Sequence, residues 1–268
     1  VTLTGNPVGG TFGGPGVTGN TFNPATLAVG GPYYVTYTYS DLNGCSNTDI
    51  QPVYVTSCAS FATLNLKMYI QGYYQDIGSS AAMDNFGMGG CLYINGLSQN
   101  ANDADHVEVS LMSTVDGTLV ESQTGVLHTD GTLSVDFAAS RNGGSYWLRV
   151  RHRNSIETWS AAPVEMSTIT PYDFTTAANK AYGDNQVEVE PGIWAIYSGD
   201  IIDADTQTPG MQDAVIESSD YSLMENDVYN VTGGYVPADI TGDGVVESAD
   251  YSIMENNVYL VISVARPF

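Results

Sequence analysis

The segment DAVIESSDYSLMENDVYNV at residues 213–231 recurs thirty residues later as DGVVESADYSIMENNVYLV at residues 243–261. Thirteen of the nineteen aligned positions are identical, so the likeness is an internal repeat rather than a coincidence. In the second copy, Tyr251, Met254 and Val258 recur at the spacing that places side chains on one face of a helix. The repeat therefore predicts two units at the end of the chain, each a polar loop followed by a short helix.

The second copy carries oxygen-bearing side chains at the spacing of a twelve-residue calcium loop that begins at Asp239 and ends at Asp250. Side chains at alternate positions of a tightly curved loop point towards one centre, where hard oxygens surround the ion at about 2.3 to 2.6 Å. Gly244, at the sixth position, allows the backbone of the sharp turn. The predicted ligands are Asp239, Thr241, Asp243, the carbonyl of Val245, Glu247 directly or through water, and Asp250.

The first copy departs from this spacing. Its loop begins at Asp200, yet the later acidic positions lie nine residues further along than in the second copy. Residues between Asp203 and Gln212 therefore resemble an insertion, and Ala214 stands where glycine is expected. The predicted ligands are Asp200, Asp213, the carbonyl of Val215, Glu217 and Asp220, with Asp203 or Asp205 able to replace the missing one. The alternative interpretation of this copy is a solvated acidic loop before a helix.

One or two calcium ions are thus expected, with a structural role. Carboxylates gathered in each loop repel one another without a metal, so folding of this region is expected to be coupled to calcium binding. A catalytic metal would need an open coordination position beside a substrate cleft, and no sequence motif indicates one. The sequence also shows no HExxH motif, no zinc-binding cysteine spacing and no recognisable catalytic triad, so we predict no enzymatic activity.

Charge and hydropathy exclude several kinds of partner. The 268 residues include 30 acidic side chains and 7 Lys and Arg, which gives a formal net charge of −23. Such a charge repels phosphate backbones and anionic headgroups, so neither nucleic acid nor a membrane surface is an expected partner. No apolar run approaches the roughly 20 residues that span a bilayer. Val1 lies in a segment expected to be a strand, which favours a piece of a longer, processed protein.

The composition favours a mostly β chain. Glycine, threonine, serine, asparagine and tyrosine are abundant and lysine is scarce, which is typical of short strands joined by tight turns. Apolar and polar residues alternate, or aromatic and branched residues gather, in segments that are predicted as strands: 33–39, 49–55, 64–70, 107–111, 133–137 and 146–151. We expect three domains: a small β domain at 1–57, a β-sandwich at 58–197 and the repeated loops at 198–268.

Two resemblances bear on the first domain and its cysteines. Residues 3–7 (LTGNP), 9–12 (GGTF), 14–17 (GPGV) and 43–46 (NGCS) resemble the immunoglobulin-like repeats of large Bacteroidota surface proteins. Such repeats carry an earlier cysteine, which this chain starts too late to contain. The resemblance therefore implies an N-terminally truncated domain in which Cys45 has lost its partner. Cys58 and Cys91 are then left as a second pair, although the sequence does not fix the connectivity.

Other resemblances cover most of the remaining chain. The order of strands and turns in 58–197 resembles transthyretin-like or carboxypeptidase-regulatory-like sandwiches. Residues 151–160 (RHRNSIETWS), 172–177 (YDFTTA) and 181–183 (AYG) resemble the C-terminal region of secreted, multi-domain Bacteroidota proteins. A final Asp ligand followed by a single helix resembles the dockerin-type calcium loop. Together they imply an extracellular or cell-surface location and a small helical, dockerin-like module at the C-terminus.

Basic residues gather in one segment. Four of the seven fall within thirteen positions, and Arg149 and Arg151 share a strand face with Trp147. This pattern favours a cationic, aromatic surface that receives acidic groups from the calcium loops or from a neighbouring subunit. The alternative is a solvent-facing strand with scattered charges. The four residues are Arg141, Arg149, Arg151 and Arg153.

The sequence favours an extracellular structural or adhesive protein, such as a fibre or filament subunit or the end of an adhesin. Its expected partner is a second copy or another surface protein, because an open sheet edge accepts a strand from another chain. Exposed aromatic residues such as Trp159 would also suit stacking on carbohydrate, although an aromatic residue in a strand usually belongs to the core. One alternative is a docking module that binds a receptor through residues 221–229 and 251–259. The other is the non-catalytic tail of a secreted hydrolase.

Overall fold

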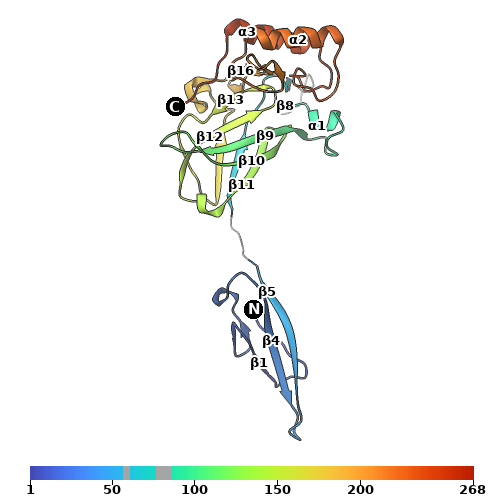
Figure 1. Ribbon diagram of the computed structural model, residues 1–268, viewed down its shortest axis with the longest axis vertical. Helices are drawn as coiled ribbons and strands as arrows, with labels where there is room; N and C mark the ends of the chain where they lie inside the picture. The colour runs from blue at the N-terminus through green and yellow to red at the C-terminus, as the bar shows by residue number, and fades with distance from the viewer. Residues whose placement is uncertain (57–60, 77–85) are drawn as a thin grey trace. The chain divides into compact units, whose positions relative to one another are not determined.

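The computed structural model describes residues 1–56, 61–76 and 86–268, which form two compact units (Figure 1). Unit 1 is Val1–Ala59 and unit 2 is Ser60–Phe268. Strands make up 41% of the chain and helices 17%, so the prediction of a mostly β protein is confirmed. The described residues contain three α-helices and four short 3₁₀ helices: α1 Cys91–Ile94, α2 Ser218–Asn230 and α3 Ser248–Leu260, with 3₁₀ turns at Pro24–Thr26, Ala139–Arg141, Ala178–Lys180 and Tyr182–Asp184.

Two sheets of unit 2 enclose a common apolar core, an arrangement consistent with a β-sandwich. One sheet is antiparallel, in the order β10-β9-β12-β13, with β14 pairing with β12; the other has the order β11-β6-β15, with β15 parallel to β6. Alternation works as predicted in β11, where Leu133, Val135 and Phe137 are buried. The strands are β6 Ala62–Lys67, β9 Asp103–Met112, β10 Leu119–His128, β11 Thr132–Phe137, β12 Ser145–His152, β13 Ser155–Trp159, β14 Val164–Glu165 and β15 Ile169–Asp173.

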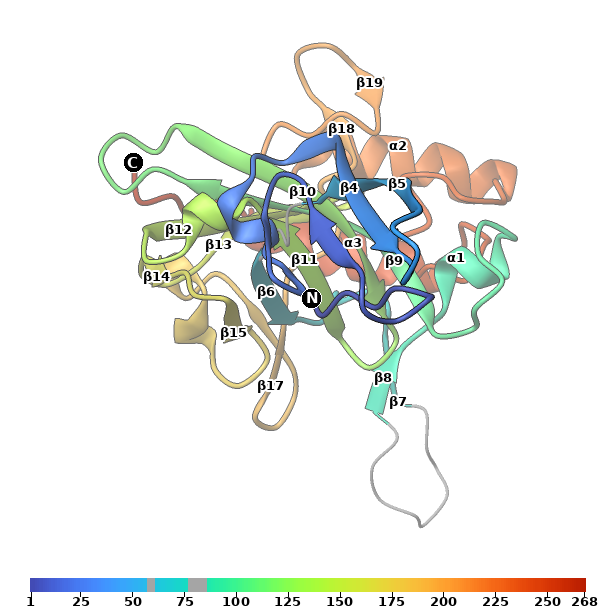
Figure 2. The same cartoon turned by 90° about the horizontal axis from the view of Figure 1, so that it is seen from below.

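Three small hairpins extend unit 2. They pair β7 Tyr74–Asp76 with β8 Phe86–Met88, β16 Val187–Glu190 with β17 Ile193–Ala195, and β18 Ile202–Asp203 with β19 Thr208–Pro209. The β18–β19 hairpin projects beside α2 (Figure 2). It contains the residues that the sequence marks as an insertion, so the first copy of the repeat carries an additional hairpin inside its loop.

Residues 198–268 belong to the same compact unit as the sandwich, although we expected them as a separate domain. Both polar and apolar contacts join residues 198–268 to the sandwich. Residues of the β12–β13 turn donate hydrogen bonds to backbone carbonyls of the C-terminal segment, as when Asn154 Nδ2 donates to Asp239 O at 2.9 Å. Ile156, on β13, is also buried in the apolar cluster that contains Met224 and Met254 of the two helices.

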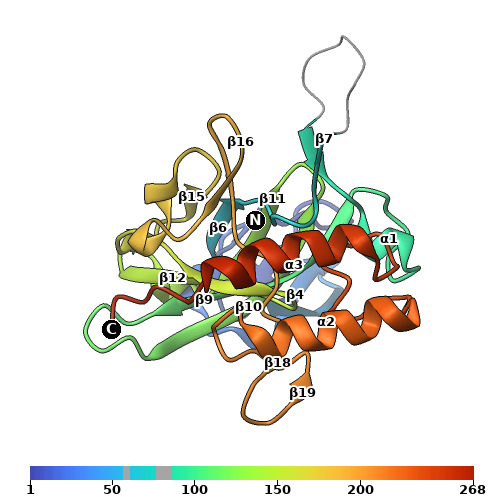
Figure 3. The same cartoon turned by 90° about the horizontal axis from the view of Figure 1, so that it is seen from above.

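Helices α2 and α3 lie side by side (Figure 3). Met254 is fully buried, and Tyr251 and Val258 pack against the same cluster, so the helix face predicted for the second copy is confirmed. Each helix starts after a glutamate whose N–H donates to an aspartate in the first turn, with N···O distances of 2.9 Å from Glu217 to Asp220 and from Glu247 to Asp250. The N-terminal ends of α2 and α3 therefore have the same structure, as their repeated sequences predict.

Both helices end on a valine in the left-handed conformation, with φ of 51° at Val231 and 50° at Val261. A β-branched residue is strained there, whereas glycine is not. Replacing either valine with glycine is expected to raise the free energy of unfolding by about 0.5 to 1 kcal/mol. Val228→Gly, inside α2, serves as the control and should lower it by at least about 1 kcal/mol. Urea unfolding measures the free energy of unfolding of each variant. If glycine at Val231 or Val261 lowers it as much as Val228→Gly does, the valines are not strained.

Unit 1 is built on a three-stranded antiparallel sheet in the order β1-β4-β5, in which β5 forms an edge. The strands predicted at 33–39 and 49–55 are confirmed and form a hairpin, since β4 and β5 pair along their length. Asp41 Oδ1 closes its turn by accepting N–H groups of Asn43 and Cys45 at 2.9 Å. Phe22 and Val35 are buried beneath the sheet. The strands are β1 Thr11–Gly13, β2 Val17–Thr18, β3 Thr21–Phe22, β4 Gly30–Ser40 and β5 Ser46–Val55.

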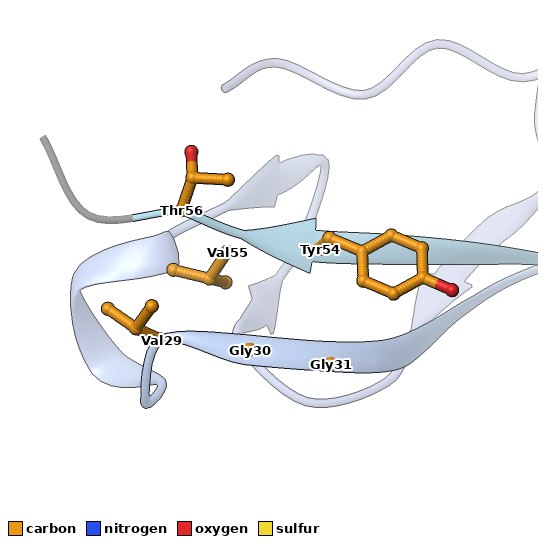
Figure 4. Close-up of a pocket in the computed structure, with 6 residues that line it drawn as sticks. All are labelled: Val29, Gly30, Gly31, Tyr54, Val55 and Thr56. Atoms are coloured by element: carbon orange, nitrogen blue, oxygen red, sulfur yellow. The ribbon is translucent and has the colours of Figure 1, made fainter.

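A mostly apolar hollow of about 400 Å³ lies where β4 begins and β5 ends (Figure 4). Its walls include the Tyr54 ring and the side chains of Val29 and Val55. Glycine is required at its floor, because a Cβ on Gly31 would lie 3.0 Å from Val53 O and 3.1 Å from the Tyr54 ring, and φ is +141°. The hollow thus depends on backbone that only glycine adopts easily.

The cysteines do not pair among the described residues. Cys45 is a free, exposed thiol and Cys91 is a free, buried one. Cys58 lies outside the described residues. Cys91 packs beneath the second loop, where a Cβ on Gly242 would lie 3.0 Å from Cys91 Cβ. Burial raises the pKa of the Cys91 thiol, which keeps it protonated and unreactive.

Candidate metal centre

The second copy of the repeat forms a closed loop, residues 239–250, called loop 2 from here on. Its first and last acidic residues, Asp239 and Asp250, are completely buried. Backbone N–H groups of the loop donate to these carboxylates: Gly242 and Gly244 to Asp239 at 2.9 and 3.2 Å, Thr241 and Glu247 to Asp250 at 2.8 and 2.9 Å. Asp243 and Glu247 are exposed, so the loop faces solvent on one side.

Thr241, at the third position of loop 2, has a side-chain oxygen that is not satisfied. Its Oγ1 is buried beside the Asp250 carboxylate but makes no hydrogen bond of adequate geometry. Leaving a buried polar atom unpaired costs about 1 to 3 kcal/mol. Asp243 is also close enough to raise the pKa values of both Asp239 and Asp250. Three carboxylates and an unpartnered hydroxyl therefore gather in this loop, at the positions that the spacing predicts.

The first copy forms the equivalent loop, residues 200–220, called loop 1. Four of its hydrogen bonds match bonds of loop 2. Ala214 N donates to Asp200 Oδ2 as Gly244 N donates to Asp239 Oδ2, both at 3.2 Å. The other three run from Ile202 N, Val215 N and Glu217 N to Asp220, Asp213 and Asp220, and match those from Thr241 N, Val245 N and Glu247 N to Asp250, Asp243 and Asp250. Val215 and Val245 also form matching β-bridges, to Ser263 and Gly233. Asp200 is therefore the counterpart of Asp239.

Loop 1 lacks an oxygen where loop 2 has Thr241, because its counterpart is Ile202. Asp203 Oδ1 accepts N–H groups of Asp205 and Thr206 at 2.9 and 2.8 Å, so this oxygen holds the turn of the inserted hairpin. Asp205 is exposed on the same turn. Ala214 adopts φ of 72°, close to the 90° of Gly244, and so keeps the sharp turn without glycine.

One oxygen of loop 1 is also unsatisfied. Asp200 is completely buried and its Oδ1 has no hydrogen-bond partner. A small cavity of about 80 Å³ lies beside it. Besides Asp200, its lining residues are Arg151, Glu157, Gln212, Asp213, Ala214 and Arg266. An ionised oxygen without a partner is expensive to bury, so Asp200 favours either a proton or a cation.

Burial and mutual repulsion raise the pKa values of the loop carboxylates. In loop 1 the pKa of Asp200 rises to about 8, through burial and then the charges of Asp220 and Asp213, and the pKa of Asp220 rises to about 6, mainly through burial. In loop 2 burial raises the pKa of Asp239 to about 6 and also raises that of Asp250. A bound cation would relieve the same penalty by neutralising the carboxylates.

These shifts predict how the metal-free protein responds to pH. In the unfolded chain Asp200 is ionised above about pH 5, whereas the folded protein holds its proton until about pH 8. From about pH 6.5 to about pH 8 the folded protein binds one more proton than the unfolded chain, so the free energy of unfolding falls as the pH rises and levels off above about pH 8. Melting in the presence of a chelator should show this fall, and Asp200→Asn should abolish it. A melting temperature independent of pH would contradict the burial of an unpaired Asp200.

Within residues 1–56, 61–76 and 86–268, no three or more His, Cys, Asp or Glu side chains form a group ready to hold a metal ion. The carboxylate oxygens of both loops accept backbone N–H groups instead. The donor set is nevertheless one of hard oxygens, from carboxylates and a hydroxyl, which suits calcium or magnesium better than zinc or copper.

A buried ion network beneath loop 2 was not predicted. The Arg153 guanidinium lies 3.0 Å from Asp105, donates to Tyr73 Oη at 2.6 Å and to Asp239 O at 3.1 Å, and stacks on Tyr235 with 4.2 Å to the ring centre. Burial alone would raise the pKa of Asp105, but His152 and Arg153 hold it well below its usual range. The arginine-rich segment signalled this network only in part, because Asp105 lies far away in sequence.

Other arginines of that segment pair with carboxylates of the sandwich. Arg141 lies 2.7 Å from Glu121, Arg149 lies 3.1 Å from Glu108, and Arg151 lies 3.8 Å from Glu157. Of the two interpretations, a cationic surface that receives the acidic loops describes Arg153, whereas Arg141, Arg149 and Arg151 are held within the sandwich.

A Ser-His-Asp series also occurs beside this network. His152 lies 2.9 Å from Ser155 Oγ through Nδ1 and 3.0 Å from Asp105 through Nε2. Its order resembles that of a catalytic triad. Ser155 and Asp105 are completely buried and His152 is 2% exposed, so a substrate has no access to the serine in this arrangement. The series holds the β12–β13 turn against β9.

Comparison with known proteins finds no matching family model, no similar curated protein and no similar solved structure. The described helices include none long and apolar enough to cross a membrane. Inference about function therefore depends on the residues of this chain alone.

Proposed function

We propose that loops 1 and 2 bind calcium and that the ions stabilise the C-terminal part of an extracellular structural protein. One observation carries the proposal: the two loops repeat the same network of buried carboxylates, and each contains an unpartnered buried oxygen, at Asp200 in loop 1 and Thr241 in loop 2. Two copies of a costly arrangement are best explained by a shared ligand that offsets the cost in both. Asp200, Asp213, Glu217 and Asp220 would hold one ion, and Asp239, Thr241, Asp243, Glu247 and Asp250 the other, with the carbonyls of Val215 and Val245.

Single substitutions distinguish the two sites. Asp250→Asn is expected to remove calcium from loop 2 and leave one ion per chain, because it removes a charge from the last ligand position while keeping the volume. Asp220→Asn is expected to do the same to loop 1. Equilibrium dialysis with radioactive calcium measures the stoichiometry, with the exposed Asp136→Asn as control. Unchanged stoichiometry in both loop variants would exclude these loops as the sites.

The chemistry of the proposed sites supports an extracellular location. Loop 1 lacks a third-position oxygen, and the last ligand in both loops is Asp, so modest affinity is expected. Calcium modules that work outside cells bind in the range of about 10⁻⁴ to 10⁻³ M, where calcium is abundant. In this proposal unit 1 is immunoglobulin-like, the sandwich is transthyretin-like and the repeated loops are dockerin-like. A non-enzymatic role is supported by the burial of the Ser155-His152-Asp105 series.

Self-association through unit 1 is the second part of the proposal. Unit 1 contains two acidic residues, Asp41 and Asp49, and no basic one, so nearly all of the net charge of −23 lies in unit 2. Contacts made by unit 1 therefore avoid the repulsion between acidic units. Its edge strand β5 is mostly exposed, with Ile50 at 55% and Tyr54 at 63%. An exposed edge of this kind accepts a strand from a second copy.

Sedimentation velocity and electron microscopy of the full chain test this assembly. The protein is expected to form dimers or filaments as its concentration rises, and Ile50→Lys should prevent this by placing a charge on β5. Leu42→Lys adds the same charge at the exposed hairpin turn and is the matched control. A monomer at every concentration, with calcium and with chelator, would overturn self-association and leave the calcium proposal intact.

A docking surface on the two helices is a second candidate function. Tyr229 and Tyr259 occupy equivalent positions and are each 87% exposed. Glu225 and Glu255 are exposed at equivalent positions too, so two similar faces are presented to solvent. Tyr229→Ala with Tyr259→Ala would abolish calcium-dependent capture of a receptor on an affinity matrix. Equal capture by the double variant would count against this function.

A further inference from the structure

Asn154, in the turn between β12 and β13, is completely buried and contacts both loops. Its side-chain Nδ2 donates to the carbonyl of Asp239, the first residue of loop 2, at 2.9 Å. Its own carbonyl accepts the N–H of Gly199, immediately before Asp200, at 2.7 Å. A single residue of the sandwich is therefore bonded to the start of each loop.

Neighbouring bonds hold the same turn. The two hydrogens of Gln212 Nε2, in loop 1, are shared among three carbonyls, those of His152, Ser155 and Asp200, at 2.9, 2.9 and 2.8 Å. Arg153 donates to the carbonyl of Asp239 at 3.1 Å. The first residue of each loop is thus fixed through its backbone carbonyl, while its carboxylate accepts N–H groups from within the loop.

Gly199, at the entry to loop 1, is closely packed against Ile216 and Met254. Its φ is +128°, and a Cβ would lie 3.1 Å from Ile216 and 3.3 Å from Met254 Sδ. Ile216 and Met254 are completely buried. The backbone entering loop 1 therefore has little room to shift, so a displacement of Asn154 is transmitted to it rather than absorbed.

We propose that Asn154 is a positioning residue for both calcium loops and couples them, so that an ion bound at one loop raises the affinity of the other. This inference rests on the proposed calcium function. Without metal the buried carboxylates of each loop repel one another and oppose its order. An ion that orders one loop also fixes the turn at Asn154, so the second ion has less ordering left to impose.

The two copies of the repeat also contact each other away from this turn, which provides a competing route for coupling. Val246 N, in loop 2, donates to Thr232 O, just after α2, at 2.8 Å, and Ile216 N, in loop 1, donates to Ile262 O, just after α3, at 2.7 Å. The rings of Tyr221 and Tyr251 contact each other between the helices at a tilt of 54°, with 5.2 Å between their centres. The test must therefore remove the contact of Asn154 while leaving these contacts in place.

A thermodynamic cycle on the full chain separates the contribution of Asn154 to the coupling from that of the other contacts. Calcium titration calorimetry gives the overall constant for two ions in the unmodified protein and the single-site constants in Asp220→Asn and Asp250→Asn. The overall constant divided by the product of the single-site constants is the coupling factor. We expect a factor of at least about 5, falling to about 1 when Asn154→Ala is added to each protein.

Asn185→Ala is the matched control, because Asn185 Nδ2 also donates to a backbone carbonyl, that of Ser263, at 3.1 Å but does not join the two loops. It should leave the coupling factor unchanged. If Asn154→Ala fails to fold, Gln212→Met removes donors to the same turn and should lower the factor likewise. A loss of stability without a change in the factor would mean that Asn154 is merely structural.

The possible results separate the inference from the function on which it rests. Two ions that bind with a factor of about 1 in the unmodified protein overturn the coupling and leave the calcium sites standing. If the coupling factor stays at about 5 or more in both Asn154→Ala and Gln212→Met, the β12–β13 turn does not couple the two loops. No saturable calcium binding in any protein overturns both proposals.

Discussion

Removing calcium with a chelator is expected to lower the melting temperature of the whole of unit 2, not only of its C-terminal helices. At a calcium concentration one hundred times the dissociation constant, each ion adds about 2.7 kcal/mol to the free energy of unfolding. Two ions therefore add about 5 kcal/mol, which corresponds to about 10 to 20 °C for a unit of this size. Differential scanning calorimetry with and without chelator measures the shift.

The whole of unit 2 is expected to melt in one transition because of the contacts of loop 2. The Asp239 carbonyl is bonded to Arg153 and Asn154 of the sandwich, so the loop cannot open without freeing the buried β12–β13 turn. Unit 1 has no part in these contacts and provides an internal reference, since its transition should not move. Separate transitions for residues 60–197 and 198–268 would show that the loops are an independent module.

Asp105→Ala is expected to lower the free energy of unfolding by about 3 to 5 kcal/mol, because it leaves a buried guanidinium without its counter-charge. Asp105 is completely buried, lies 3.0 Å from both Arg153 and His152, and accepts hydrogen bonds from Tyr73 and Tyr235. Asp105, on β9, is therefore bonded to both the β12–β13 turn and the segment before loop 2. Urea unfolding monitored by tryptophan fluorescence measures the loss.

Two further variants serve as controls for Asp105→Ala. Glu165→Ala removes an exposed carboxylate and should change the free energy of unfolding by no more than about 0.5 kcal/mol. Asp105→Ala combined with Arg153→Met removes both charges and should recover part of the loss, because an apolar pair is tolerated better than a single buried charge. A small effect of Asp105→Ala alone would mean that Arg153 finds another partner or reaches water.

Local features were predictable from the sequence. Alternation identified β4, β9, β11 and β12 because the side-chain period of a strand appears directly in the order of residues. The repeat identified both helices, and its broken spacing identified the insertion, which the structure shows as the β18–β19 hairpin. Equivalent hydrogen bonds in loops 1 and 2 match the predicted alignment of Asp200 with Asp239 and of Asp220 with Asp250.

Contacts between distant segments were predictable only in small part. The arginine cluster indicated a surface for the acidic loops, and Arg153 does meet Asp239, but nothing in the sequence indicates that Asn154 approaches the same residue. The parallel pairing of β15 with β6 is likewise set by the fold, since the segments lie about a hundred residues apart. The Ser155-His152-Asp105 series arises in the same way, from a turn that packs against β9.

The most direct measurement of the central claim is a calorimetric titration of the metal-free full chain with calcium. The buried carboxylate networks of loops 1 and 2 predict saturable binding of two ions per chain, with protons released on binding near pH 7 because the pKa of Asp200 is raised to about 8. A titration that shows no saturable binding, with magnesium and calcium giving the same dilution heats, would contradict the claim that these loops are metal sites.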